Sequence, residues 1–204
     1  MLEALDLAAR RGSAQLFSRL DLRVEPEFAL VVTGANGTGK TTLLRILAGL
    51  SLPAEGRVRW RGNDMGPFAE ALRRDAVFCG HLTALKDDLT AQENLSALVA
   101  LAGEPAAAAD VSDALANVSL RAQAGLPVRA LSQGQRRRLG LARLALTQRP
   151  LWLLDEPATA LDADGLALLT RLLTGHLRRG GCAVVATHQP LDLAATNIRG
   201  LALS

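Results

Sequence analysis

Short runs of consecutive apolar residues alternate along the chain with longer segments in which apolar residues recur at helical spacing. The short runs are typical of buried strands, and the longer spacing is typical of helices with one apolar face. Runs at Phe28–Thr33, Asp75–Cys79, Leu151–Leu154 and Cys182–Thr187 therefore predict strands. Because strands that alternate with helices form parallel sheets covered on both faces, we expect an α/β fold with a mostly parallel core sheet.

The segment between the second and third of these strands is helical in pattern. Residues 87–130 contain no strand-like run. Thr90 begins a capping box that opens a helix, and the alanine-rich stretch over 105–118 predicts another. We therefore expect a helical subdomain of roughly residues 87–147, inserted in a single domain of residues 1–204.

Two further regions complete the predicted order. Ser132 caps a long helix that runs through about Thr147, and residues 165–179 are helical in spacing. Residues 1–33 divide into strands at turns over 11–13 and 25–27, which predicts an N-terminal antiparallel β portion beside the core sheet.

Composition leaves ample material for a core and argues against a nucleic-acid partner. Hydrophobic residues make up 49% of the chain, the net charge is only +3, and aromatic residues make up 3% with no tyrosine, so no base-stacking platform is expected. The cluster Arg136–Arg138 predicts a solvated helix face, with a nucleic-acid patch as the alternative. Cys79 and Cys182 lie in apolar, strand-like runs without metal-binding spacing, which predicts small buried side chains in a reducing compartment.

A phosphate-binding loop is the strongest chemical signal. Residues Gly34–Thr41 fit the pattern G-x-x-x-x-G-K-S/T without a mismatch, between a predicted strand and the predicted helix at Thr42–Gly49. Glycines let backbone N–H groups turn inward around phosphate oxygens, and the helix N-terminus adds positive charge. An ordinary glycine-rich turn is the alternative, which the flanking strand and helix disfavour. The candidate nucleotide-binding residues are Gly34, Ala35, Asn36, Gly37, Thr38, Gly39, Lys40, Thr41 and Thr42.

Two carboxylates follow the third predicted strand. A parallel strand delivers residues such as Asp155 and Glu156 to the carboxyl edge of the sheet, where α/β folds bind ligands. Lys40 is suited to the β- and γ-phosphates of ATP, and Thr41 and Asp155 are suited to Mg²⁺. Glu156 is suited to polarise the attacking water. Two carboxylates that merely cap a strand are the alternative, but with the phosphate-binding loop upstream we expect Mg²⁺-dependent ATP hydrolysis.

The segment Leu131–Gln135, Leu-Ser-Gln-Gly-Gln, precedes the acidic strand by one predicted helix. Taken alone, its serine predicts only a helix cap. In this order, however, the chain resembles the ATP-binding-cassette (ABC) ATPases, whose signature has the form L-S-G-G-Q, with Gln133 here in place of the first glycine. The resemblance covers essentially the whole chain, and it implies that Ser132, Gly134 and Gln135 contact the nucleotide.

Other marks of that family follow in order. Ala160–Asp162 resembles the loop that crosses the family's dimer interface, and His188 resembles its switch histidine, which could hydrogen-bond the γ-phosphate. The alternative for His188 is an ordinary surface histidine at a strand end. Together with Glu156, His188 is therefore a candidate catalytic residue.

Two positions depart from the family pattern. The family usually has a glutamine ahead of a Glu-Asn pair, and counting back from Glu93–Asn94 gives His81, to which we assign a role toward Mg²⁺ or water. The family also commonly stacks an aromatic residue on adenine upstream of the phosphate-binding loop. Here Arg10–Arg11 stands in that region, and a guanidinium plane could stack on the base instead.

The resemblance also implies partners. Two copies would bind two ATP molecules head to tail as a homodimer, with Ser132 and Gly134 of one copy facing the phosphates held by Lys40 of the other. Separate multi-span membrane subunits would receive the motion, through the helical subdomain and the loop around His81. With no signal-peptide core at Met1–Asp6, the chain is expected on the cytoplasmic face of the inner membrane, held there by those subunits.

Several segments narrow the resemblance further. They are similar to the ATP-binding export proteins of cytochrome c biogenesis over residues 80–86, 89–95, 131–138, 149–157 and 187–191. That group implies energy coupling for haem export or for the release of a haem-loaded chaperone. The alternatives are the ATPase of another ABC exporter, for lipid or lipoprotein, and a soluble ABC ATPase that acts on ribosomes or DNA. A small-molecule kinase would share only the phosphate-binding loop.

Overall fold

The computed structural model describes residues 1–80, 84–191, 193 and 197–203, in two compact units. The first unit contains Met1–Gly80, Arg149–Glu156 and Leu173–Ser204, and the second contains His81–Gln148 and Pro157–Leu172. Position 81 lies outside the described residues, so the role predicted for His81 stays a prediction.

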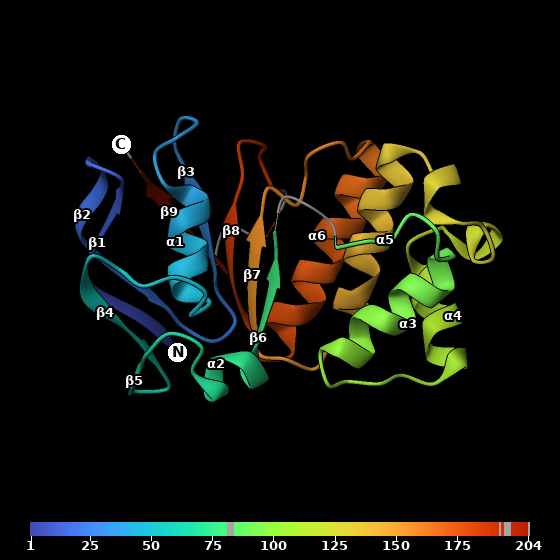
Figure 1. Cartoon of the computed structure of the whole chain (residues 1–204), viewed down its shortest axis with the longest axis horizontal. Coiled ribbons are helices and arrows are strands. Elements are labelled where there is room, and N and C mark those ends of the chain that lie inside the picture. The colour runs from blue at the N-terminus through green and yellow to red at the C-terminus, as the bar shows by residue number, and fades with distance from the viewer. Residues whose placement is uncertain (81–83, 192, 194–196, 204) are drawn as a thin grey trace. The chain divides into compact units, whose positions relative to one another are not determined.

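An antiparallel sheet occupies the N-terminal part of the first unit (Figure 1). Its strand order is β2-β1-β4-β5, with the bounds β1 Leu2–Arg11, β2 Ala14–Val24, β4 Glu55–Trp60 and β5 Asn63–Met65. The predicted antiparallel portion is confirmed, and its turns fall where expected. Strand β5 was not predicted, because its three residues are too few and too polar to show a strand pattern.

A parallel sheet forms the core of the same unit. Its order is β6-β7-β8-β3-β9, with the bounds β6 Ala76–Cys79, β7 Leu151–Asp155, β8 Cys182–Ala186, β3 Ala29–Thr33 and β9 Ile198–Ala202. The four strands predicted from apolar runs are confirmed: β6 lies at one edge of the sheet, and β7, β8 and β3 are its inner strands. Strand β9 was not predicted, because its residues are only partly buried and include an arginine and a glycine.

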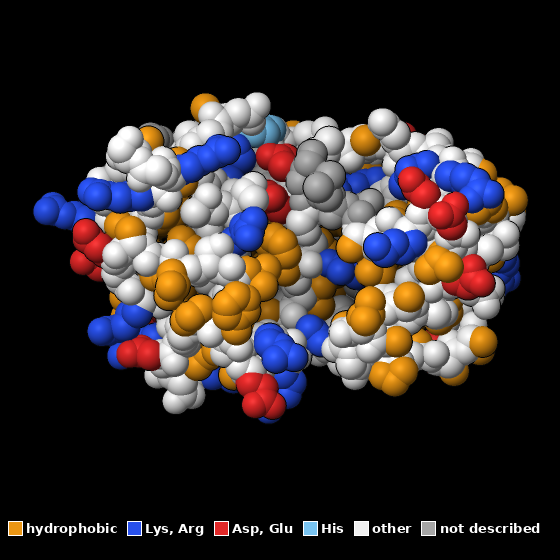
Figure 2. All heavy atoms as spheres, viewed as in Figure 1, with side chains coloured by type: hydrophobic (Ala, Val, Ile, Leu, Met, Phe, Trp, Pro, Cys, Tyr) orange, Lys and Arg blue, Asp and Glu red, His pale blue; other side chains and the backbone are white. Residues whose placement is uncertain are grey.

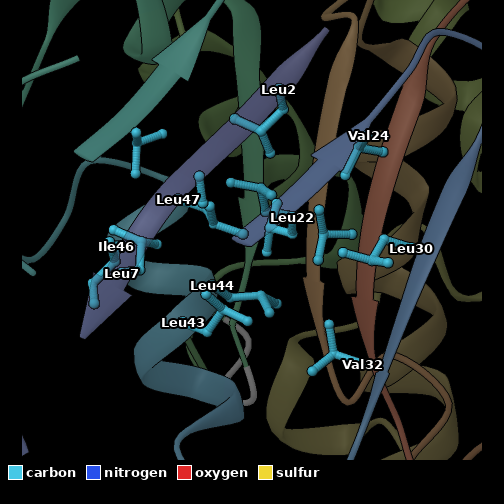
Figure 3. Packing of buried hydrophobic residues seen from close by; sticks show 14 of the residues in the cluster. Leu2, Leu7, Leu22, Val24, Leu30, Val32, Leu43, Leu44, Ile46 and Leu47 are labelled. Atoms are coloured by element: carbon cyan, nitrogen blue, oxygen red, sulfur yellow. The ribbon is translucent and has the colours of Figure 1, made fainter. Parts of the chain in front are cut away.

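Helix α1 (Lys40–Leu47) begins directly after the phosphate-binding loop and contacts β7, β8 and β1. Figure 3 shows how its apolar side chains meet those of the two sheets. The labelled residues come from α1 (Leu43, Leu44, Ile46, Leu47), β1 (Leu2, Leu7), β2 (Leu22, Val24) and β3 (Leu30, Val32). Burial of this cluster anchors the start of α1, and with it Lys40, at the carboxyl edge of β3. The short helix α2 (Glu70–Asp75) was not predicted.

The second unit is helical, as expected for the inserted segment. Its elements are α3 (Ala91–Leu101), α4 (Ala108–Asn117), α5 (Gln133–Leu146), the short 3₁₀ turns η1 (Arg121–Gln123) and η2 (Val128–Ala130), and the first part of α6 (Ala163–Arg178). Both predicted caps are present: Thr90 forms a capping box with Glu93, and Ser132 forms one with Gln135. The core of this unit is a leucine- and alanine-rich cluster that includes Leu95, Leu115, Leu139 and Leu168.

The prediction of a solvated face at Arg136–Arg138 is wrong. All three side chains are half-buried, and each contacts another segment of the second unit. Arg136 pairs with Asp87 at 3.1 Å, Arg137 donates to the carbonyl of Pro157, and Arg138 pairs with Asp162. Figure 2 shows Lys and Arg side chains (blue) spread over the face drawn and not gathered in one patch. The cysteine prediction holds for Cys182, which is buried, whereas Cys79 is only half-buried.

A buried histidine lies at the end of α6 in the first unit. His176 is 4% exposed, its ring stacks on Trp152 at 3.9 Å between centroids, and its Nε2 lies 3.0 Å from the carbonyl oxygen of Cys182. A Cβ on Gly181 would come within 2.2 Å of the imidazole, so only glycine fits against this ring. Burial lowers the pKa of His176 to about 4, against the opposing effect of the Cys182 carbonyl.

Acidification is therefore expected to destabilise the fold through His176. The unfolded chain binds a proton at about pH 6.5, and the folded chain binds it only near pH 4. The contribution of neutral His176 is therefore complete above pH 6.5 and is lost progressively as the pH falls toward 4, by on the order of 3 kcal/mol. Urea unfolding at a series of pH values measures this. His176→Phe, which keeps a ring on Trp152 but cannot titrate, should flatten the profile. An equal slope in both proteins would remove His176 as the cause.

Candidate nucleotide-binding site

The loop between β3 and α1 has a backbone that only glycine adopts easily. Gly34 has a φ of 147° and Gly39 a φ of 100°, both in the region that side chains disfavour. A Cβ at Gly34 would also lie 2.5 Å from the carbonyl oxygen of Leu203, and one at Gly39 would lie 3.1 Å from Leu16 and Phe17. The glycines of the motif are thus required by packing as well as by conformation, and the loop remains open for backbone N–H groups to meet phosphate oxygens.

Lys40 is buried within this loop at 7% exposure. Its Nζ donates to the carbonyls of Gly34 at 2.7 Å and Ala35 at 3.1 Å, and it lies 3.0 Å from Nε2 of His188. Because an ammonium only donates, Nε2 of His188 is the acceptor in this contact. The ammonium is thus held by two carbonyl oxygens and one imidazole nitrogen, which phosphate oxygens could replace as its partners.

Thr41 and Asp155 meet at the end of β7. The Thr41 hydroxyl donates to Oδ2 of Asp155 at 2.8 Å, and Asp155 is buried. A hydroxyl oxygen beside a carboxylate is the donor set that Mg²⁺ accepts in phosphate-binding loops. The two residues predicted as metal ligands therefore lie side by side, and their chemistry fits this ion.

Glu156 and His188 form the other side of the site. Glu156 has a φ of 49°, and its N–H donates to the carbonyl of Ala186 in β8 at 2.8 Å, which holds it in this unusual conformation. Its Oε1 lies 3.3 Å from Nε2 of His188, which follows the end of β8. A cation, an imidazole, a hydroxyl and two carboxylates thus converge at the carboxyl edge of three neighbouring parallel strands, which is a ligand-binding position in α/β folds.

The remaining predicted contacts lie elsewhere. Ser132, Gly134 and Gln135 are at the start of α5 in the second unit, where the Ser132 hydroxyl accepts from the N–H of Gln135 at 3.2 Å and the Gln135 amide oxygen accepts from the N–H of Ser132 at 2.9 Å. Sequence reasoning found the cap at Ser132 but missed its reciprocal partner, although serine followed three residues later by glutamine is a known capping-box pattern. Arg10 and Arg11 are exposed at the end of β1, and their stacking on a base stays a prediction.

Comparison with known proteins extends these observations. The family model described as ABC transporter matches residues 17–159. A cytochrome c biogenesis ATP-binding export protein CcmA from Pseudomonas aeruginosa is 50% identical over 193 residues, which cover 95% of this chain and 95% of that protein. A CcmA protein from Dechloromonas aromatica is 45% identical over 203 residues, which cover 100% of both.

Solved structures share the fold. A putative ABC transporter ATP-binding protein from Pyrococcus furiosus superposes with a TM-score of 0.85 at 23% identity, covering 99% of this chain and 96% of the other. A bacterial ABC transporter cassette of dimeric structure gives a TM-score of 0.84 at 24% identity, covering 99% and 94%. At these identities the likeness concerns the fold alone, and it confirms the expected antiparallel sheet, parallel core and helical subdomain.

The fold and the site define an ATP-binding cassette with an ATP-hydrolysing centre. The chain belongs to the ABC transporter family of ATP-binding proteins and, within it, to the group of the CcmA proteins. Among the described residues, no helix combines the length and the apolar character needed to span a bilayer.

Proposed function

We propose that the protein is the energy-coupling ATPase subunit of a membrane export complex for c-type cytochrome biogenesis. The observation that carries the proposal is its identity of 45–50% to proteins of that name over almost its full length. Haem, or a haem-loaded chaperone that ATP hydrolysis releases, is the cargo that we infer. The arrangement of Lys40, Thr41, Asp155, Glu156 and His188 supports the ATPase part of the proposal.

Each of these residues has a separate role in ATP hydrolysis. Lys40 exchanges the loop carbonyls of Gly34 and Ala35 for β- and γ-phosphate oxygens. Thr41 and Asp155 would hold Mg²⁺, which supplies neutralisation of the phosphate charge. Glu156 orients the attacking water and accepts its proton.

His188 must change its hydrogen bonding during this cycle. In this structure Nε2 of His188 lies 3.0 Å from the ammonium of Lys40, which can only donate, so Nε2 is the acceptor in this contact. To donate to a γ-phosphate oxygen, Nε2 must be protonated. Release of Lys40 toward the phosphates frees Nε2 for this role, so the two residues exchange partners together.

We further propose a head-to-tail homodimer in which Ser132 and Gly134 of one copy cover the nucleotide bound by Lys40 of the other. A cassette of the same fold has a dimeric structure, which supports this arrangement. In each copy, Lys40 and Ser132 lie in different compact units. Each site would be completed by the second copy.

An exposed apolar group in the first unit supports a membrane subunit as a further partner. Leu52 is 70% exposed and Phe68 is 68% exposed, and Leu50 is also exposed. The loops that carry them are joined by a hydrogen bond from the Phe68 N–H to the carbonyl of Gly49 at 2.8 Å. Figure 2 shows hydrophobic side chains (orange) gathered over the lower end of α1 on the face drawn. We infer that a multi-span subunit covers them and holds the protein at the cytoplasmic face of the inner membrane.

Deletion of the gene is expected to abolish c-type cytochromes, because no other subunit would supply ATP hydrolysis to the export complex. Covalent-haem staining of membrane proteins measures this, and b-type cytochromes, whose haem is not covalently bound, serve as the internal control. The wild-type gene should restore the stained bands and a Lys40→Ala gene should not. Normal c-type cytochromes in the deletion strain would contradict the proposal. Altered envelope lipid or lipoprotein would then favour another exporter, and recovery of the protein with ribosomes or DNA would favour an ABC ATPase outside transport.

A further inference from the structure

The loop Pro157–Asp162, which follows Glu156 and leads into α6, is held at both ends by α5. Arg137 donates from Nε to the carbonyl of Pro157 at 3.3 Å. Arg138 donates from Nη2 to both carboxylate oxygens of Asp162, at 2.5 and 2.7 Å. Consecutive arginines of the helix that begins with the signature residues thus fix the first and last residues of this loop.

The middle of the loop also lies against the signature. A Cβ on Gly134 would be 3.5 Å from the carbonyl oxygen of Ala160. Ala160 has a φ of 62°, which an alanine adopts only under restraint, while Ala158 is fully buried. The N–H of Leu161 donates to the carbonyl of Ala158 at 3.2 Å. The loop is therefore a compact turn whose strained backbone needs support from outside.

Asp162 serves both α6 and α5. Its Oδ1 accepts from the N–H of Gly165 at 2.9 Å, which caps α6, and both of its oxygens accept from Arg138. The hydrogen bond from Arg138 lowers the pKa of the Asp162 carboxyl, and the Gly165 N–H acts in the same direction. The Asp162 side chain is 65% exposed, but that of Arg138 is only 18% exposed. A partly buried arginine that grips one carboxylate through both oxygens is a geometric restraint of a kind that surface ion pairs rarely provide.

We propose that Arg138 is a positioning residue for the ATP-bound dimer. It locks the Pro157–Asp162 loop to the start of α5, so that Ser132, Gly134 and the loop present one continuous surface to a second copy. This inference rests on the proposed head-to-tail dimer. Since Arg138 and Lys40 lie in different units, loss of the lock should weaken association of the two copies and leave the first binding of nucleotide to each copy unchanged.

Substitutions can separate this role from simple capping of α6. Asp162→Asn keeps a good N-cap but removes the charge and one of the two oxygens that Arg138 grips. Arg138→Lys keeps the charge but lacks the rigid, planar guanidinium that orients the donor toward Asp162, and Arg138→Gln keeps neither the charge nor the guanidinium. Asp113→Asn is the matched control, because it breaks the ion pair of Asp113 with Arg121, a 3.3 Å pair elsewhere in the second unit with both side chains exposed.

The experiment uses the full chain carrying Glu156→Gln, in which bound ATP should persist. Sedimentation with ATP and Mg²⁺ gives the dimer association constant, and equilibrium binding of a non-hydrolysable ATP analogue to dilute, monomeric protein gives nucleotide affinity. We expect Asp162→Asn and Arg138→Gln each to weaken association about 10-fold, because each removes a charge-assisted contact. Arg138→Lys should weaken association to an intermediate extent. The double variant Arg138→Gln and Asp162→Asn should associate no more weakly than either single variant, because both substitutions break the same contact. The affinity for nucleotide should be unchanged in all of these variants.

The outcomes are distinguishable. Association that falls in these variants but not in Asp113→Asn supports the proposal. If all of the variants associate as tightly as the parent, the role proposed for Arg138 is wrong, and the head-to-tail dimer is unaffected. Equal losses of nucleotide affinity and association would also overturn it, because they indicate a general structural role. If the parent itself does not associate with ATP, the head-to-tail dimer is wrong and the role of Arg138 is wrong with it.

Discussion

Replacement of Glu156 by glutamine is expected to abolish steady-state ATP hydrolysis while ATP still binds. The amide keeps the shape of the side chain and its contact distance to His188, but it cannot accept a proton from the attacking water. Loss of a general base lowers the rate by at least about 100-fold. Release of inorganic phosphate measures hydrolysis, and light scattering should detect an ATP-stabilised dimer that accumulates because the nucleotide is no longer consumed.

The matched control is Glu70→Gln, the same substitution at an exposed glutamate of the first unit, at the start of α2. It should leave hydrolysis unchanged. Near-normal turnover in Glu156→Gln would remove Glu156 from the catalytic role and leave the proton of the water to another acceptor. Loss of ATP binding together with turnover would instead show that the substitution disturbs the site, whose backbone at Glu156 is already held in a left-handed conformation.

Lys40→Ala is expected to act earlier in the cycle. It removes the ammonium that contacts Gly34, Ala35 and His188. The β- and γ-phosphates of ATP then lose the positive charge that would bind them. Hydrogen bonds to charged groups contribute roughly 1.5–3 kcal/mol, so the affinity for nucleotide should fall about 10- to 100-fold, and turnover should fall with it. Equilibrium binding of a non-hydrolysable ATP analogue measures the first effect, and phosphate release measures the second.

Lys86→Ala provides a control of the same chemistry, since Lys86 is the only other lysine of the chain and is exposed. Its affinity for nucleotide should equal that of the wild type. Unchanged affinity in Lys40→Ala would mean that the backbone N–H groups of the loop and the end of α1 hold the phosphates without help from the ammonium.

Much of the fold could be predicted from the sequence, because buried parallel strands leave a strong local pattern. Leu151–Leu154 and Cys182–Ala186 are continuous apolar runs, and both became fully buried central strands. The elements that were missed lack such a pattern. Strand β5 has three residues, and β9 lies at the edge of its sheet, where only one neighbour, β3, is needed to hold it. Pairing with an existing strand, and not local preference, decides such elements.

Part of the site was predictable for a different reason. The residues Lys40 and Thr41 are contiguous with the glycines that shape their loop, and Asp155 and Glu156 are adjacent at the end of one strand. Their chemistry is visible in a short window. The pairing of Lys40 with His188 across 148 positions, and that of Arg138 with Asp162 across 24, leaves no such trace. Opposite charge alone could have joined Arg138 to other carboxylates of the chain.

By itself the sequence determined that a phosphate-binding loop forms and that an acidic strand end follows it, since local backbone preferences and hydrophobic spacing act over a few residues. Only the tertiary structure decided that β8 lies between β7 and β3 in the parallel sheet, which brings Asp155 to Thr41 and His188 to Lys40. The tertiary structure also decided that Arg137 and Arg138, which follow the signature, bind the Pro157–Asp162 loop and do not form a solvated face. Strand order and side-chain pairing of this kind depend on which distant surfaces bury each other, and no local window contains both partners.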